Sequence, residues 1–147
     1  MRGNAQLARL IVEPPLEREG AVKEIVYAAA PRTDEFYLSD AGEFMIEYWK
    51  RPWENVDGYA SHSPLTFAAH VTTPLLIQHG ENDRRVPIAG AWKFYRALKA
   101  LGKTVDLDIY PRGGHVLFEP VQEREQMRRN LEWFQRWLRS AAAQPPL

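Results

Sequence analysis

The sequence contains no cysteine, which excludes disulfide bonds, thiolate nucleophiles and cysteine-ligated metal sites. It also contains no uninterrupted apolar run that approaches the roughly 18 residues needed to span a bilayer. Neither sign of charge dominates, because 19 Lys and Arg residues balance 19 Asp and Glu residues. Nucleic-acid-binding surfaces are usually basic, so we expect neither nucleic acid nor a membrane among the partners of this chain.

The composition is that of one ordinary globular domain. Of the 147 residues, 45% are hydrophobic, which is enough to build a single core. The first residues, MRGNAQLARLIVEPP, lack the long apolar segment and the small-residue cleavage site of a secretory signal. We therefore expect a cytoplasmic protein.

Three short apolar runs predict β-strands. Residues 22–30 (VKEIVYAAA) and 74–80 (PLLIQHG) are nearly continuous apolar runs bounded by charge, Pro or Gly, as is typical of strands buried on both faces. Residues 104–111 (TVDLDIYP) alternate apolar and polar side chains, which indicates a half-exposed edge strand.

Two further segments show the apolar spacing of helices. Residues 87–102 open with a proline and close with a glycine, as helices often do. A second helix is expected over 122–140, with its many Arg and Glu residues on the solvated side. The side chains expected to face the core are Ile88, Ala91, Trp92, Tyr95, Leu98 and Leu101 in the first helix and Met127, Leu131, Phe134 and Leu138 in the second.

Strands that alternate with helices predict an α/β fold, with a small, mostly parallel sheet flanked by helices. In such a sheet the carboxyl ends of the strands share one edge, and active sites form there. Asp83 follows strand 74–80 and His115 follows strand 104–111, so both should lie on that rim. A carboxylate so placed can hold an imidazole through its Nδ1 proton and leave Nε2 for the substrate.

From spacing alone, two other interpretations of this pair stay open. The two residues could sit in ordinary solvated loops, as most charged loop residues do. A metal site could also form from His79, His115 and a carboxylate, since imidazole and carboxylate are common metal ligands.

The sequence around the pair resembles the end of the catalytic domain of the prolyl oligopeptidase family, an α/β-hydrolase. Residues 72–115, TTPLLIQHGENDRRVPIAGAWKFYRALKALGKTVDLDIYPRGGH, carry most of the similarity, including an acid three residues after a His-Gly strand end and a Gly-Gly-His turn. Residues 51–64, RPWENVDGYASHSP, add to it. The resemblance covers about residues 25–140.

The resemblance implies a partial α/β-hydrolase fold and a serine-type hydrolase of peptides or small esters. Position by position, Asp83 matches the catalytic acid and His115 the catalytic base. Glu81 matches no catalytic position and is expected to be a surface carboxylate. The family resemblance implies no metal ion and no organic cofactor.

The family's nucleophile lies in a Gly-x-Ser-x-Gly turn, a motif that this sequence lacks. Residues 1–15 resemble the helix that follows this turn, so Met1 would stand at or next to the missing serine. We therefore expect residues 1–140 to form the C-terminal half of a catalytic domain and residues 141–147 to be a disordered tail. The serines present are Ser39, Ser61, Ser63 and Ser140, none with the flanking glycines.

Two functions remain open at this point. One is a working hydrolase, and the other is a truncated, non-catalytic hydrolase that acts as an oligomeric interaction protein. The aromatic-rich segment 36–53 would flank the substrate pocket in the first case and form an interface in the second. It could also belong simply to the core.

We predict a homodimer, because a half-domain would expose the edge of strand 22–30, and an open apolar edge invites another strand. Light scattering behind a sizing column at micromolar concentration should give twice the monomer mass, and Ile25→Lys should weaken the dimer. A stable monomer, with segment 1–20 folded back over the edge, is the opposite outcome.

Overall fold

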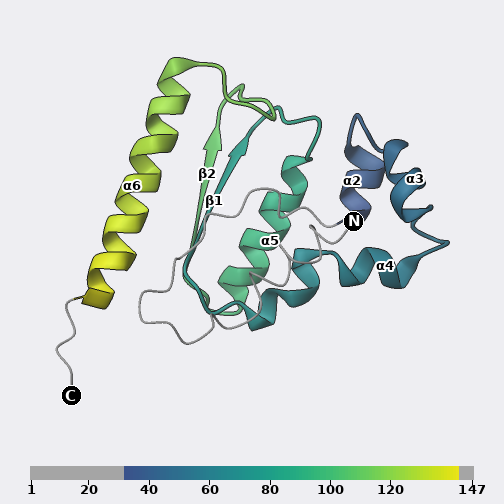
Figure 1. The fold of residues 1–147 in the computed structure, drawn as a ribbon, viewed down its shortest axis with the longest axis horizontal. Helices are drawn as coiled ribbons and strands as arrows, with labels where there is room; N and C mark the ends of the chain where they lie inside the picture. Colours follow the sequence, from purple (N-terminus) through teal and green to yellow (C-terminus); the bar gives the residue numbers. More distant parts are fainter. Residues whose placement is uncertain (1–31, 143–147) are drawn as a thin grey trace.

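The computed structural model describes residues 32–142 of the chain. These residues form helices on both sides of a small parallel sheet (Figure 1). In chain order the elements are α2 (Arg32–Leu38), α3 (Phe44–Trp49), α4 (Val56–Ser61), the 3-10 helix η1 (Pro64–His70), β1 (Leu75–Gly80), α5 (Ile88–Ala100), β2 (Val105–Tyr110) and α6 (Pro120–Ala142). The predicted α/β class is confirmed.

The sheet of the described residues pairs β1 with β2 in parallel, from Leu75 opposite Val105 to Gly80 opposite Tyr110. All six residues of β1 are buried, as its continuous apolar run predicts. The strands expected over 74–80 and 104–111 are thus confirmed, and the parallel register brings their carboxyl ends level with each other.

The strand predicted over 22–30, and with it the dimer edge, lies outside the described residues. The division into a half-domain over 1–140 and a tail over 141–147 also stays a prediction, since residues 143–147 lie outside the description. Judged by length and hydropathy, none of the helices in residues 32–142 could cross a membrane.

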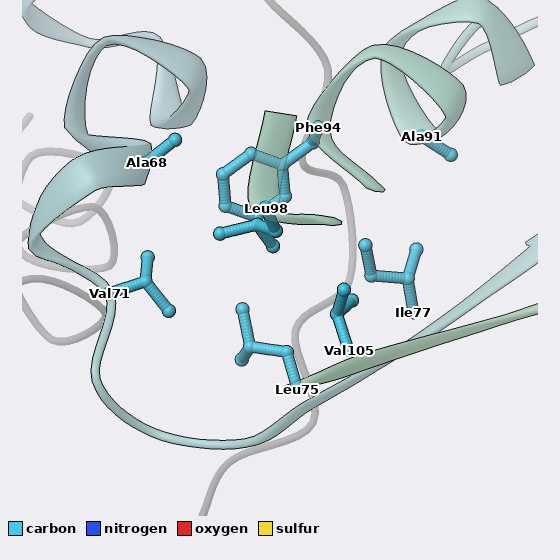
Figure 2. Packing of buried hydrophobic residues seen from close by; sticks show 8 residues of the cluster. All are labelled: Ala68, Val71, Leu75, Ile77, Ala91, Phe94, Leu98 and Val105. Atoms are coloured by element: carbon cyan, nitrogen blue, oxygen red, sulfur yellow. The ribbon is translucent and has the colours of Figure 1, made fainter. Parts of the chain in front are cut away.

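The main core lies between the sheet and α5 (Figures 1 and 2). Phe94 and Leu98 of α5 are fully buried, and the apolar side chains of both strands pack with them. The cluster is completed from the other side by η1 and the residue that follows it. Its members are Ala68, Val71, Leu75, Ile77, Ala91, Phe94, Leu98 and Val105.

The buried face of α5 is rotated from the predicted one. Phe94, which the expected apolar set omitted, is fully buried, whereas Trp92 and Leu101 are exposed. Trp92 lies instead under the guanidinium of Arg96, 5.5 Å from the ring centroid, a cation–π contact on the surface.

The helix α6 covers the opposite face of the sheet (Figure 1), and its buried face also differs from the predicted one. Met127 and Leu131 are exposed, while Trp133 is buried. Polar contacts join α6 to β2: Arg129 donates to Asp108 at 2.8 Å, and Asp106 lies 3.5 Å from the same guanidinium. The hydrogen bond to Asp108 raises the pKa of the Arg129 guanidinium.

None of the aromatic side chains in segment 36–53 is itself buried. Two of them, Phe36 and Trp49, meet edge-on the ring of Tyr59 of α4, which is buried. Its hydroxyl donates to the carbonyl of Lys50 at 2.9 Å. Trp53, in contrast, is largely exposed.

Two leucines of the same helical region test the core. Leu98 is 0% exposed and Leu101 is 48% exposed. Leu98→Ala should lower the free energy of unfolding by about 2–5 kcal/mol, because it opens a cavity in the packed cluster. Leu101→Ala should cost about 1 kcal/mol or less, since half of that side chain already meets water. Urea unfolding followed by circular dichroism measures both, and equal losses would contradict this core.

Candidate active site

The candidate site is built from the two loops that leave the carboxyl ends of β1 and β2. Backbone hydrogen bonds join these loops directly: Glu81 N–H donates to Tyr110 O at 2.9 Å, and Asn82 N–H donates to Gly113 O at 2.8 Å. The Glu81 carboxylate also accepts from Arg112 N–H at 3.0 Å. The parallel register therefore continues past the strands as a loop-to-loop contact.

Glycine is required where the loops touch. A Cβ at Gly80 would lie 2.2 Å from the carbonyl oxygen of Gly114 and 2.5 Å from that of Gly113. No side chain fits such a contact, because backbone atoms cannot move aside cheaply. The backbone at the His-Gly end of β1 thus lies directly against the backbone of the Gly-Gly pair before His115.

The loop before His115 is also held by an arginine in an unusual conformation. Arg112 has φ 62°, a left-handed value that is uncommon for a side-chain-bearing residue. Its guanidinium forms a two-pronged ion pair with Glu119, with N–O distances of 3.3 and 2.9 Å, and this hydrogen bonding raises the pKa of Arg112. Glu81, expected to be an ordinary surface carboxylate, holds the backbone of the same residue.

Asp83 is buried within its own loop. Its Oδ1 accepts from the backbone N–H groups of Arg85 at 2.9 Å and Val86 at 2.8 Å, a local turn that asparagine and aspartate favour. Its side chain is 6% exposed. Both N–H bonds fall on one oxygen, so the other oxygen, Oδ2, is left to face the neighbouring loop.

The structure brings together the two predicted site residues. His115 Nδ1 lies 3.0 Å from Asp83 Oδ2. A carboxylate can only accept, so Nδ1 carries the proton and, in the neutral ring, Nε2 is free to take one. The His115 side chain is 55% exposed, which leaves it open to a substrate. Their catalytic roles stay a prediction.

A second imidazole, which sequence reasoning did not assign to the pair, lies next to the same carboxylate. His79, in β1, has Nε2 3.7 Å from Asp83 Oδ2 and 2.9 Å from the carbonyl oxygen of Val86. The four-residue spacing of His79 and Asp83 across the end of β1 is the sequence signal that could have predicted this contact. Within residues 32–142, no three His, Asp or Glu side chains come together in a way that could hold a metal ion.

A cavity of about 70 Å³ adjoins the pair. Buried polar groups line it from the sheet, where Gln78 Nε2 donates to the Tyr110 hydroxyl at 3.0 Å. Residues of the two loops and Gln126 of α6 complete it. Its lining includes Gln78, His79, Asp83, Tyr110, His115 and Leu117.

Two serines of the described region hydrogen-bond to backbone carbonyls away from His115. Ser39 donates to the carbonyl of Arg85 at 2.7 Å, and Ser61 donates to that of Gly58 at 3.2 Å. Ser63 is buried at the start of η1. The side chain of Ser140 lies outside the description.

Comparisons with known proteins agree on one family. A family model described as the prolyl oligopeptidase family matches residues 24–141. An uncharacterized peptidase, YuxL, of Bacillus subtilis is 36% identical over 102 residues, which are 68% of this chain and 15% of that protein. The human acylamino-acid-releasing enzyme is 37% identical over 78 residues, 53% of this chain and 11% of that protein.

A solved structure shares the fold as well. The acylaminoacyl peptidase of Pyrococcus horikoshii superposes with a TM-score of 0.79 at 27% identity, over 93% of this chain and 23% of that one. The chain therefore spans less than a quarter of these relatives. Over that part the sequence match and the α/β-hydrolase fold point the same way, and the chain belongs to the prolyl oligopeptidase family.

Proposed function

We propose that this chain carries the acid and the general base of a serine-type hydrolase that acts on peptides or small esters. The observation that carries the proposal is the 3.0 Å contact between Asp83 Oδ2 and His115 Nδ1 at the shared strand rim. Support for a peptide substrate comes from the relatives, which are named as peptidases or as an enzyme that releases acylated amino acids.

In this proposal His115 transfers the proton of the nucleophile, and Asp83 keeps His115 in the tautomer that can accept it. As the nucleophile's oxygen attacks the substrate carbonyl carbon, its proton passes to Nε2 of His115. The imidazolium then gives that proton to the leaving group as the bond to the carbonyl carbon breaks. Asp83 fixes the tautomer through Nδ1–H and stabilises the transient positive charge. The serine and the oxyanion donors are not assigned to residues of this chain.

A second candidate is a non-catalytic interaction protein, and the apolar surface favours it. Large hydrophobic side chains are exposed on and between the helices α2 to α4, and others are exposed in the loop after β2 and on α6. Large exposed apolar side chains are common at interaction sites. The most exposed examples are Tyr37, Val56, Trp53, Phe118, Val121 and Met127.

Turnover of a p-nitrophenyl acyl ester tests the assigned base, because turnover that depends on His115 would support the hydrolase over the interaction protein. The isolated chain should show at most weak turnover, because an imidazole without its serine loses most nucleophilic catalysis. Any turnover should disappear in His115→Ala and persist in Ser39→Ala, Ser61→Ala and Ser63→Ala. Robust turnover that survives His115→Ala would contradict the assigned base, and turnover lost in one serine variant would identify that serine as the nucleophile.

Asp83→Asn should reverse the tautomer of His115. The amide oxygen would keep the two backbone N–H bonds now made to Oδ1, so the amide nitrogen would take the place of Oδ2 and face His115. Nδ1 must then accept, which moves the proton to Nε2 and blocks the base. Imidazole ¹⁵N chemical shifts report the tautomer directly.

The matched control for this prediction is Asp57→Asn, an exposed carboxylate on α4. It should leave His115 in the Nδ1–H form. A wild-type His115 whose neutral ring carries its proton on Nε2 would overturn the proposed pair, because the carboxylate would then not be accepting a hydrogen bond from Nδ1.

A further inference from the structure

His79 lies at the same rim, and the proposed function assigns it no role. It lies in β1 immediately before Gly80, it is 8% exposed, and its ring is directed at the loop that carries Asp83. A buried histidine is often just a satisfied core residue. The contacts of its Nε2 atom place this one beside the carboxylate of Asp83.

The proton on His79 can be assigned from its partner. Nε2 lies 2.9 Å from the carbonyl oxygen of Val86. A carbonyl only accepts, so Nε2 must be the donor. The N–H group of this same Val86 donates to Asp83 Oδ1 at 2.8 Å. His79 and Asp83 thus hold the two backbone groups of one residue, and together they close the loop from within.

The same Nε2–H also lies beside the oxygen that receives His115. The distance of 3.7 Å from Nε2 to Asp83 Oδ2 is too long for a hydrogen bond. It still places the positive end of the N–H dipole next to a carboxylate oxygen. In a buried position such an interaction is screened less than in water. Asp83 Oδ2 is therefore flanked by two imidazoles, that of His115 at hydrogen-bond distance and that of His79 at 3.7 Å.

We propose that His79 is a positioning residue for the acid–base pair. Its Nε2–H fixes Val86, and through Val86 it fixes Asp83, so that Oδ2 stays aimed at His115 Nδ1. The inference rests on the proposed function, since it assigns His79 to the support of the same base. It differs from a purely structural role because it predicts a change at His115, on the other loop, in a chain that remains folded.

The test reads the imidazole ¹H–¹⁵N spectrum, which is simple because the chain has four histidines. His79→Leu removes the donor, and His79→Gln replaces it with an amide nitrogen of similar reach. The matched controls are His70→Leu and His70→Gln, at an exposed position at the end of η1. Amide spectra and the unfolding midpoint establish that each variant is folded.

His79→Leu should lower the ratio of Nδ1–H to Nε2–H tautomer at His115 by about three- to tenfold, the effect expected from the loss of one hydrogen bond. His79→Gln should restore most of that ratio, and both His70 variants should leave it unchanged. A folded His79→Leu chain with a wild-type ratio would overturn the proposal, and so would a His79→Gln chain that behaves like His79→Leu.

The wild-type chain gives a second test that needs no variant. His79 itself must be the Nε2–H tautomer, and a neutral His79 protonated at Nδ1 would overturn the proposal even if His79→Leu does not fold. The failures are distinguishable: a wild-type His115 outside the Nδ1–H form counts against the proposed hydrolase pair. An Nδ1–H His115 that is insensitive to His79 counts against the positioning role alone.

Discussion

The rest of the site depends on one carboxylate, Asp83, whose two oxygens bind different partners. Oδ1 of Asp83 is occupied by the N–H groups of Arg85 and Val86, so the loop after β1 is folded around it. Oδ2 is thereby left for His115 on the next loop. The same group shapes its own loop and orients its neighbour, and the chemistry proposed for His115 follows from that division.

This arrangement needs the two loops to be closer than side chains normally allow. The parallel register ends with Gly80 opposite Tyr110, and the glycines at 80 and 113 let the backbones meet. Glu81 and Arg112 add a side-chain tie between the same loops. The core that includes Phe94 and Leu98 packs against the strands from which both loops leave. The core packing, the strand register and the glycines therefore all contribute to the short distance between the loop that carries Asp83 and the loop that carries His115.

The sequence was informative where the signal is local. Continuous and alternating apolar runs predict β1 and β2, and the rule that parallel strands end on one edge places Asp83 near His115. The buried faces of α5 and α6 could not be predicted as well. Apolar spacing does not reveal contacts between residues distant in the sequence, such as the hydrogen bond from Arg129 of α6 to Asp108 of β2 that accompanies the observed face.

The roles of His79 and Glu81 were also beyond local patterns. Glu81 contacts Arg112 of the other loop, which is possible only once the two strands are paired. His79 contacts Val86 of the loop after its own strand, which requires that loop to be folded. A buried histidine and a charged loop residue have many ordinary explanations in a sequence. The strand expected over 22–30 stays a prediction, since it lies outside the described residues.

The most direct measurement is a double-mutant cycle on the central contact. Unfolding free energies of the wild type, Asp83→Ala, His115→Ala and the double variant give the coupling between the two side chains. A hydrogen-bonded pair predicts a coupling of about 0.5–1.5 kcal/mol. A coupling indistinguishable from zero, with all four chains folded, would contradict the account.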